Sequence, residues 1–257
     1  MPEKRLRWYC HPRPDDMPPA AVTGGVAVII DVLRASTTIV TALAEGAAFV
    51  LPTAQITAAR HFQRDLPPGT LLGGERGGKP IAGFDLGNSP AEYCRSQVAG
   101  RGIVMTTTNG TVALARCQQA REALIGCLVN RTAVAMLAAR LADEATGVHL
   151  VCAGTDGQVT EEDLLGAGAI LDAAVSEPVC GVPLLDTAGE HALGAFRRLT
   201  TGVTDPASSL VDAFTRAAGG MNLVRIGMAA DLPFAATVDR FNLVPQRCAE
   251  TGRLLLR

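Results

Sequence analysis

Four short polar clusters carry most of the side chains in this chain that could do chemistry. They cover residues 31–38, 75–88, 106–111 and 155–163, and each follows an apolar segment or its glycine turn. Ligands of open parallel sheets bind beyond the carboxyl ends of the strands, so clusters at such positions are candidates for a shared site. A single cluster is better explained as a helix-capping turn. Four clusters on the same side of one sheet favour a common pocket.

The basic and hydroxyl groups in these clusters indicate phosphate binding. Arginine presents a planar fork of donors to anionic oxygens, and helix starts rich in serine, threonine and glycine offer hydroxyl and backbone N–H groups. On these grounds we expect a small anionic phosphorylated substrate to be bound by Arg34, Ser36, Thr37, Arg76, Lys79, Asn88, Thr107, Thr108, Asn109 and Gly110.

The carboxylates in the same clusters indicate a hard metal ion. Mg²⁺ prefers oxygen ligands and usually keeps several of its waters. The residues that we expect to hold Mg²⁺ are Asp31, Asp156 and Glu162, and those expected to be catalytic are Asp31, Glu75 and Asp156. For Glu162 a helix-dipole explanation competes, because acids are favoured in the first turn of any helix. No histidine falls in the clusters, which argues against zinc.

The glycine-rich segment Gly73–Pro90 is the most unusual stretch of the chain. Its first seven residues match the G-x-x-x-x-G-K core of a nucleotide-binding P-loop, but Pro80 stands where that motif needs serine or threonine. At its end, Ser89 and Glu92 have the spacing of a capping box, with Pro90 at the first helical position. The segment therefore predicts an ordered loop that closes on a helix start.

Apolar runs alternate with helix-forming stretches along the first 175 residues. Short continuous apolar runs are typical of strands buried on both faces. The strands expected here are 26–30, 48–51, 71–72, 102–105, 123–129 and 148–153. The helices expected between and after them are 39–45, 53–65, one after Ser89, one ending at 120, 132–144 and 160–175. This order predicts an α/β fold, with a largely parallel or mixed sheet and helices on both faces.

The two ends of the chain are less regular. Residues 1–16 read as a polar leader without the apolar run of a signal peptide. Toward the other end we expect helices 187–199 and 206–218, and two strands, 241–245 and 254–256, paired antiparallel at a sheet edge. No linker is evident, so we expect a single domain over residues 1–257. A two-lobed arrangement and an internal duplication remain open alternatives.

Composition limits the classes of partner. The chain has 257 residues, 48% of them hydrophobic, and a net charge of −2, which gives no general case for binding nucleic acid or an anionic membrane. The seven cysteines are scattered, with no C-x-x-C pair, as in a cytoplasmic protein with reduced thiols. We therefore expect a cytoplasmic protein, with a homodimer as an open alternative.

Five segments in order resemble the 2-phosphosulfolactate phosphatase (ComB-like) family. They are IIDVLRASTTIVTAL from Ile29, GGERGGKPIAGFDLGNSP from Gly73, TTTNGT from Thr106, CAGTDG from Cys152 and EDLLGAGAI from Glu162. A looser match, DLPFAATVDRFNLVP, begins at Asp231, and the C-terminal third departs most.

The resemblance implies a Mg²⁺-dependent phosphatase that converts (2R)-2-phospho-3-sulfolactate to 3-sulfolactate and phosphate, a step of coenzyme M synthesis in methanogens. Mg²⁺ and basic side chains would neutralise the phosphoryl oxygens while a water attacks in line. The identity of the general base and the formation of a phosphoenzyme stay open. Two other functions also stay open: a phosphatase of the same fold acting on another phosphorylated hydroxy acid, and a non-catalytic polyanion-binding protein.

Overall fold

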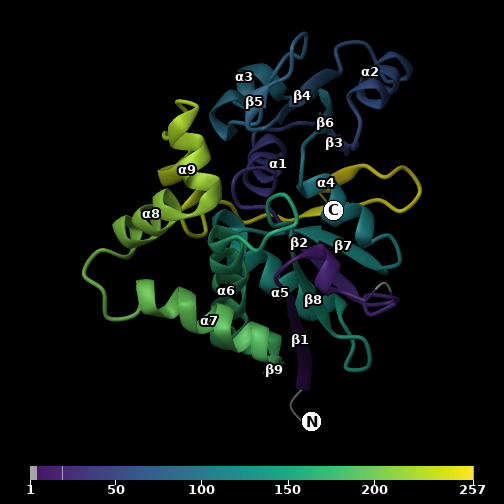
Figure 1. Ribbon diagram of the computed structural model, residues 1–257. Coiled ribbons are helices and arrows are strands. Elements are labelled where there is room, and N and C mark those ends of the chain that lie inside the picture. Colours follow the sequence, from purple (N-terminus) through teal and green to yellow (C-terminus); the bar gives the residue numbers. More distant parts are fainter. Residues whose placement is uncertain (1–4, 19, 257) are drawn as a thin grey trace.

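A computed structural model describes residues 5–18 and 20–256 of the chain, and in them one mixed sheet of eleven strands forms the centre of the molecule (Figure 1). The order of the strands is β5-β4-β6-β3-β11-β10-β7-β2-β8-β1-β9. Their bounds are β1 Arg5–His11, β2 Val26–Ile30, β3 Phe49–Pro52, β4 Leu71–Arg76, β5 Lys79–Pro80, β6 Gly102–Thr106, β7 Glu122–Ile125, β8 Val148–Cys152, β9 Val182–Leu185, β10 Pro245–Arg247 and β11 Leu254–Leu256.

Helices cover both faces of this sheet, which confirms the predicted α/β class. The α-helices are α1 Ala35–Ala44, α2 Ile56–Asp65, α3 Arg95–Val98, α4 Gly110–Arg116, α5 Arg131–Leu141, α6 Glu161–Ser176, α7 Thr187–Thr200, α8 Pro206–Arg216, α9 Ala218–Arg225 and α10 Asp231–Ala235. On β2, Val28 faces α5 and α6, where a side chain at Gly126 would meet it together with Ile170. The next residue, Ile29, faces the opposite side and lines a small cavity with Leu114 of α4.

The sheet consists of two parallel blocks that run in opposite directions. In the first block, β4 and β3 both pair parallel with β6; in the second, β7, β2, β8, β1 and β9 are all parallel. Between the blocks lies the antiparallel hairpin β10–β11, which pairs antiparallel with β7 on one side and with β3 on the other. Three antiparallel steps in succession reverse the strand direction from β3 to β7. Figure 1 shows the hairpin in yellow, passing between the two blocks.

Two expectations from the sequence are wrong about the placement of strands. The last two strands are antiparallel as predicted, but the first of them is Pro245–Arg247 and not 241–245, and the hairpin lies at the centre of the sheet and not at an edge. Consequently the four polar clusters do not leave the same edge of one parallel sheet. Clusters 31–38 and 155–163 follow β2 and β8 of the second block, whereas clusters 75–88 and 106–111 begin at the ends of β4 and β6 in the first block.

The supposed polar leader contains a strand of the sheet. In β1, the fully buried Leu6 and Trp8 alternate with the exposed Arg5 and Arg7 and the partly exposed Tyr9. The strand pairs with β8 and β9. Such alternation of apolar and polar residues is typical of a strand that buries one face. Because of Arg5 and Arg7, the sequence of this strand resembles that of a solvated segment.

The end of the glycine-rich segment forms its predicted cap but only a short helix. The capping box of Ser89 and Glu92 is present, and it begins a 3₁₀ turn over Pro90–Glu92, with α3 following at Arg95.

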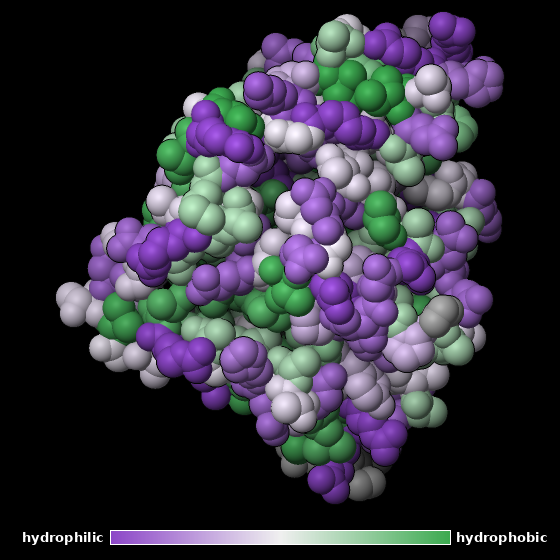
Figure 2. All heavy atoms as spheres, viewed as in Figure 1, coloured by the Kyte–Doolittle hydropathy of each residue, from purple (hydrophilic) through white to green (hydrophobic). Residues whose placement is uncertain are grey.

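The surface of the molecule in Figure 2 shows polar and apolar residues intermixed over the face in view. Within the described residues, no helix is both long and apolar enough to span a membrane.

Candidate active site

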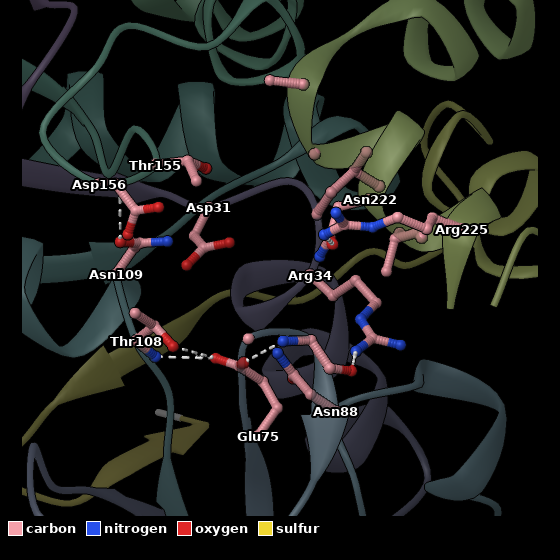
Figure 3. Close-up of a pocket in the computed structure, with 16 residues that line it drawn as sticks. Asp31, Arg34, Glu75, Asn88, Thr108, Asn109, Thr155, Asp156, Asn222 and Arg225 are labelled. Atoms are coloured by element: carbon pink, nitrogen blue, oxygen red, sulfur yellow. Dashed lines mark hydrogen bonds between the residues drawn. The ribbon is translucent and has the colours of Figure 1, made fainter. Parts of the chain in front are cut away.

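The loops that follow the two blocks meet in one pocket of about 310 Å³. Each of the four polar clusters contributes to its wall, so the clusters converge although their strands run in opposite directions. The predicted site residues that line the pocket are Asp31, Arg34, Glu75, Asn88, Thr108, Asn109 and Asp156 (Figure 3). The predicted site residues that do not line it are Ser36, Thr37, Arg76, Lys79, Thr107, Gly110 and Glu162.

Asp31 lies at the middle of the pocket wall, between Asp156 on one side and Arg34 on the other (Figure 3). It directly follows β2, and its Oδ1 accepts a hydrogen bond of 3.2 Å from the backbone N–H of Ala35 at the start of α1. Burial, together with the charges of Glu75 and Glu162, raises the pKa of Asp31 to about 7, although hydrogen bonds from the backbone of Ala35 and Gly110 oppose the shift. The site therefore disfavours a bare carboxylate at Asp31 and favours one that meets a proton or a cation.

Glu75 joins the loops after β4 and β6. Its Oε1 accepts hydrogen bonds from the backbone N–H and the hydroxyl of Thr108 at 2.8 and 2.9 Å, and its Oε2 accepts one from the N–H of Gly78 at 2.7 Å. All these donors belong to the pocket wall. Glu75 is 7% exposed, so its carboxylate fixes the shape of the wall as well as adding negative charge.

Arg34 and Asn88 also line the pocket. The Arg34 guanidinium is buried, and it donates to Asp231 Oδ2 at 2.6 Å and to the carbonyl oxygen of Gly78 at 2.7 Å. The side chain of Asn88 is also buried, and its Oδ1 has no hydrogen-bond partner among the described residues. A buried polar atom without a partner is costly, so the wall is built to meet another group.

Glu162 and Asp163 lie in the first turn of α6, as predicted, but both are buried there. Asp163 accepts hydrogen bonds from the backbone N–H groups of Val32 and Gly154 at 2.8 and 2.9 Å, and so ties the loop after β2 to the loop after β8. Glu162 Oε1 accepts from the N–H of Gly219 at 3.2 Å, whereas its Oε2 has no partner among the described residues. Burial raises the pKa of both carboxyl groups.

The donor chemistry of this region suits a hard cation. Glu75 and Glu162 lie close enough to Asp31 for their charges to raise its pKa. In addition, Oε2 of Glu162 is buried without a hydrogen-bond donor among the described residues. A divalent cation offsets repulsion of this kind, and oxygen atoms are its preferred ligands. Within the described residues, however, no three acidic, histidine or cysteine side chains form a ready-made metal cluster, so Asp31, Asp156 and Glu162 are not gathered as a preformed set of ligands.

Several predicted substrate-binding residues instead support the pocket from behind. Ser36 donates to the carbonyl oxygen of Ile29 and accepts from the N–H of Asp31, and Thr37 donates to the carbonyl oxygen of Val32. Thr107 is buried behind the wall. Gly110 begins α4, where a side-chain Cβ would lie 2.7 Å from Asp31 Oδ2, so the glycine allows the helix to approach the carboxylate.

Arg76 and Lys79 lie on the strands of the β4–β5 hairpin, away from the pocket wall. The Arg76 guanidinium donates to the carbonyl oxygens of Glu75 and Ala54 at 2.7 and 2.8 Å and to the hydroxyl of Thr106 at 2.8 Å. Lys79 is exposed. The turn between them, and not these two cations, contributes to the pocket through Gly77 and Gly78.

The sequence analysis missed the contribution of the C-terminal third. Gly219, Asn222 and Arg225 of α9 line the pocket, and Asp231 of α10 binds Arg34 behind it. Only Asp231 had a signal in the sequence, because it opens the loosely matching C-terminal segment. Nothing in the spacing of the α9 residues links them to the four clusters, all of which lie earlier in the chain.

The α/β fold brings carboxylates, an arginine and backbone N–H groups together in one pocket, as a protein that binds a small anionic molecule requires. A family model described as 2-phosphosulpholactate phosphatase matches residues 11–250. The chain therefore belongs to the 2-phosphosulfolactate phosphatase family, as its motifs predict.

Curated relatives agree with this assignment over nearly the whole chain. A probable 2-phosphosulfolactate phosphatase of Deinococcus radiodurans is 43% identical over 232 residues, which are 90% of each chain. One of Symbiobacterium thermophilum is 42% identical over 90% of this chain and 94% of its own. One of a Synechococcus species is 39% identical over 95% of this chain and 96% of its own.

Proposed function

We propose that this protein hydrolyses (2R)-2-phospho-3-sulfolactate to 3-sulfolactate and phosphate. The observation that carries the proposal is the meeting of Asp31, Arg34 and Asn88 in one pocket of a chain that belongs to this phosphatase family. Residues from both blocks of the sheet line the pocket, many of them charged or polar, and Arg34 offers a fork of donors to anionic oxygens.

The proposed cofactor is Mg²⁺, for which Asp31 and Glu162 are the ligands best supported. Asp31 is crowded by other carboxylates, and Glu162 has an oxygen without a donor, so each gains from a nearby cation. Asp156 is exposed at the mouth of the pocket and could reach the same ion through water. Bound Mg²⁺ supplies positive charge to the phosphoryl oxygens and polarises the ester.

The chain's own residues bind and orient the phosphoryl group. Arg34 has two N–H groups engaged by the protein, and the other three of its five remain for anionic oxygens. Asn88 lies beside it in the pocket wall. On the other side, Asp156 lies at the mouth near Asn109, where its carboxylate can orient a water for in-line attack.

The proposal is tested by phosphate release from the purified protein. We expect release from 2-phosphosulfolactate that stops in EDTA and returns when Mg²⁺ is added. A panel of 2-phospholactate, 2-phosphoglycerate and 3-phosphoglycerate identifies the substrate class. Faster hydrolysis of a substrate that lacks the sulfonate would favour a phosphatase for another hydroxy acid. Binding of these compounds without release of phosphate would favour a polyanion-binding protein.

A further inference from the structure

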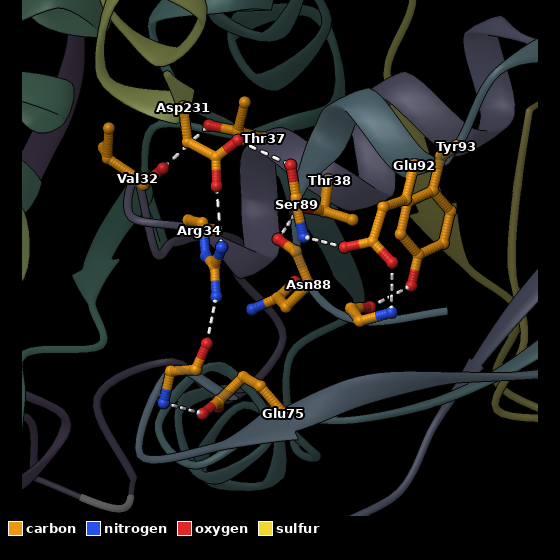
Figure 4. Close-up of polar contacts among 12 residues, drawn as sticks. Val32, Arg34, Thr37, Thr38, Glu75, Asn88, Ser89, Glu92, Tyr93 and Asp231 are labelled. Atoms are coloured by element: carbon orange, nitrogen blue, oxygen red, sulfur yellow. Dashed lines mark hydrogen bonds and ion pairs between the residues drawn. The ribbon is translucent and has the colours of Figure 1, made fainter. Parts of the chain in front are cut away.

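A buried ion pair connects the pocket to the C-terminal part of the chain (Figure 4). Arg34 Nη1 donates to Asp231 Oδ2 at 2.6 Å, and the two side chains are only 3% and 5% exposed. The second oxygen of Asp231 accepts a hydrogen bond of 2.6 Å from the hydroxyl of Ser89. Both carboxylate oxygens are therefore engaged, one by the loop after β2 and one by the end of the glycine-rich segment.

The second anchor of Arg34 lies on the β4–β5 turn. Nη2 donates to the carbonyl oxygen of Gly78 at 2.7 Å, and Gly78 is itself held by Glu75 through its N–H. Two fixed acceptors at different nitrogens determine the plane of the guanidinium. Because three N–H groups remain and Arg34 lines the pocket, the anchors leave part of the fork available to a ligand.

Stability alone does not account for this arrangement. Burying two opposite charges removes both from water, and a buried ion pair is often no more stabilising than well-packed apolar residues in its place. Asp231 also neutralises Arg34, so the pair adds no net positive charge to a pocket that should attract an anion. The ion pair weakens the positive charge of Arg34 but fixes the direction of its N–H groups, so it is suited to orienting the guanidinium.

The neighbouring carboxylates explain why orientation is needed. Asp31 and Glu75 line the same pocket as Arg34, and each attracts a free guanidinium on a long side chain. A guanidinium bound to either of them would lie across the space where a phosphoryl group must bind. Asp231 approaches from α10, outside the pocket wall, and holds the guanidinium on its own side.

We propose that Asp231 is a positioning residue, which keeps the fork of Arg34 directed at the substrate's anionic oxygens and away from the pocket's own carboxylates. The inference rests on the proposed function, because it deepens the role of Arg34 in the same site. Ser89 completes the arrangement by fixing the free oxygen of Asp231.

A double-mutant cycle tests the proposal. Asp231→Asn keeps the shape of the side chain but removes its charge, and we expect kcat/KM for 2-phosphosulfolactate to fall by roughly 10-fold or more. In an Arg34→Gln background the same substitution should cost no more than about twofold, because a residue that acts only through Arg34 loses its effect when Arg34 is absent. Ser89→Ala removes the hydrogen bond to the other oxygen of Asp231. We expect it to lower kcat/KM less than Asp231→Asn does, and to have no effect in the Arg34→Gln background.

The matched control is Asp172→Asn. Asp172 also accepts from two partners, Arg131 and Arg197, but it joins α6 to α5 and α7 and does not line the pocket. We expect this variant to lower the melting temperature with kcat/KM unchanged. If Asp231→Asn behaves like Asp172→Asn, or if its effect multiplies with that of Arg34→Gln, Asp231 is only a structural residue.

Binding of inorganic phosphate, measured by calorimetry on the same variants, separates this proposal from the proposed function. Phosphate affinity should fall in Asp231→Asn and should be insensitive to that change once Arg34 is replaced. The same coupling in a protein that does not hydrolyse 2-phosphosulfolactate would overturn the proposed reaction and leave the positioning role in place. Unchanged phosphate affinity in Asp231→Asn would overturn the positioning role even if hydrolysis is observed.

Discussion

At the scale of the residue, the buried carboxylate of Asp31 allows a test of the proposed metal site. The negative charges of Glu75 and Glu162 repel this buried carboxylate when no cation is bound nearby. Asp31→Asn removes the charge at nearly constant volume. We expect kcat/KM to fall by about 100-fold or more, as for other groups that stabilise charge in a transition state.

The same variant should be more stable than the wild type in EDTA. We expect its melting temperature to rise by about 3 °C, the shift that roughly 1 kcal/mol produces in a chain of this size. Differential scanning fluorimetry and phosphate release on one preparation measure both effects. Asp212→Asn is the control, because Asp212 is an exposed acid on α8 outside the pocket, and neither quantity should change there. A less stable Asp31→Asn would show that the carboxylate is a structural acceptor first.

Arg76 and Lys79 are a natural pair for a second test. From the sequence both are expected to bind anions, but Arg76 has three protein acceptors and Lys79 is exposed. Arg76→Ala should therefore lower the free energy of unfolding by about 1–3 kcal/mol, and Lys79→Ala by less than ~0.5 kcal/mol. Denaturant titration measures both values.

Kinetics decide whether either cation also binds substrate. We expect kcat/KM of both variants, corrected for the folded fraction, to stay within about threefold of the wild type, because neither side chain lines the pocket. A loss of ~10-fold or more in Arg76→Ala at unchanged stability would restore the role in anion binding that its sequence context predicts.

At the scale of elements, the contact between α4 and the loop after β2 can be tested without removing any functional group. A Cβ at Gly110 would lie 2.7 Å from Asp31 Oδ2 and 3.0 Å from Ala35 Cβ. Gly110→Ala should therefore displace Asp31 and lower kcat/KM by about 10-fold, since misplacing a catalytic group by 1 Å can cost two orders of magnitude.

Gly194 of α7 supplies the control for that variant. A Cβ there would meet only the far end of the Arg198 side chain, at 3.5 Å. Gly194→Ala should raise the free energy of unfolding by about 0.5–1 kcal/mol through helix propensity, with activity unchanged. Wild-type activity in Gly110→Ala would mean that Asp31 can move without consequence.

Local patterns in the sequence predicted elements well and long-range pairing poorly. The apolar run of β2 and the capping box at Ser89 are local signals, and both features form where expected. The central position of β10–β11 depends on partners more than 100 residues away, Leu124 for Gln246 and Val50 for Leu254, and no local pattern encodes such a choice.

For the candidate site too, local signals in the sequence were informative and long-range contacts were not visible. Asp31 and Asn88 were predicted to lie at the site because each belongs to a dense motif: Asp31 directly follows the apolar run of β2, and Asn88 lies in the glycine-rich segment. Arg225 could not be predicted, and Asp231 had only the loose C-terminal match, because the short helices that carry them reach the site only through tertiary packing. For Arg76 the sequence shows a positive charge but not the backbone carbonyl groups that its guanidinium contacts, and its predicted role in substrate binding stays a prediction.

For the whole molecule, a buried histidine pair makes stability depend on pH. His11 Nε2 and His149 Nδ1 are 3.0 Å apart, and His149 Nε2 lies 3.1 Å from the carbonyl oxygen of Thr146. A carbonyl accepts only, so His149 donates through Nε2 and accepts from His11 through Nδ1. Burial, with the neighbouring imidazole, lowers the pKa of His11 to about 4, although Asp186 and Asp16 partly oppose the shift; burial also lowers the pKa of His149.

The sign of the effect follows from proton uptake. Between pH 6.5 and about 4 the unfolded chain protonates His11 and the folded chain does not, so stability falls as the pH falls through this window. We expect His11 to account for about 2–3 kcal/mol of that loss. Urea titrations at pH 7.5 and 4.5 measure it, and His11→Gln should lose correspondingly less stability on acidification. His61→Gln, which changes a side chain that is 72% exposed, should match the wild type at both pH values.

The central hairpin also has a consequence for the order of events during synthesis. β10 and β11 follow every other described strand in the chain, so both parallel blocks leave the ribosome before the strands that join them by hydrogen bonds exist. Asp31 comes from one block and Glu75 from the other. The chain positions that line the pocket are therefore all synthesised before β10 and β11, and the two blocks can become one continuous sheet only after these last strands have left the ribosome.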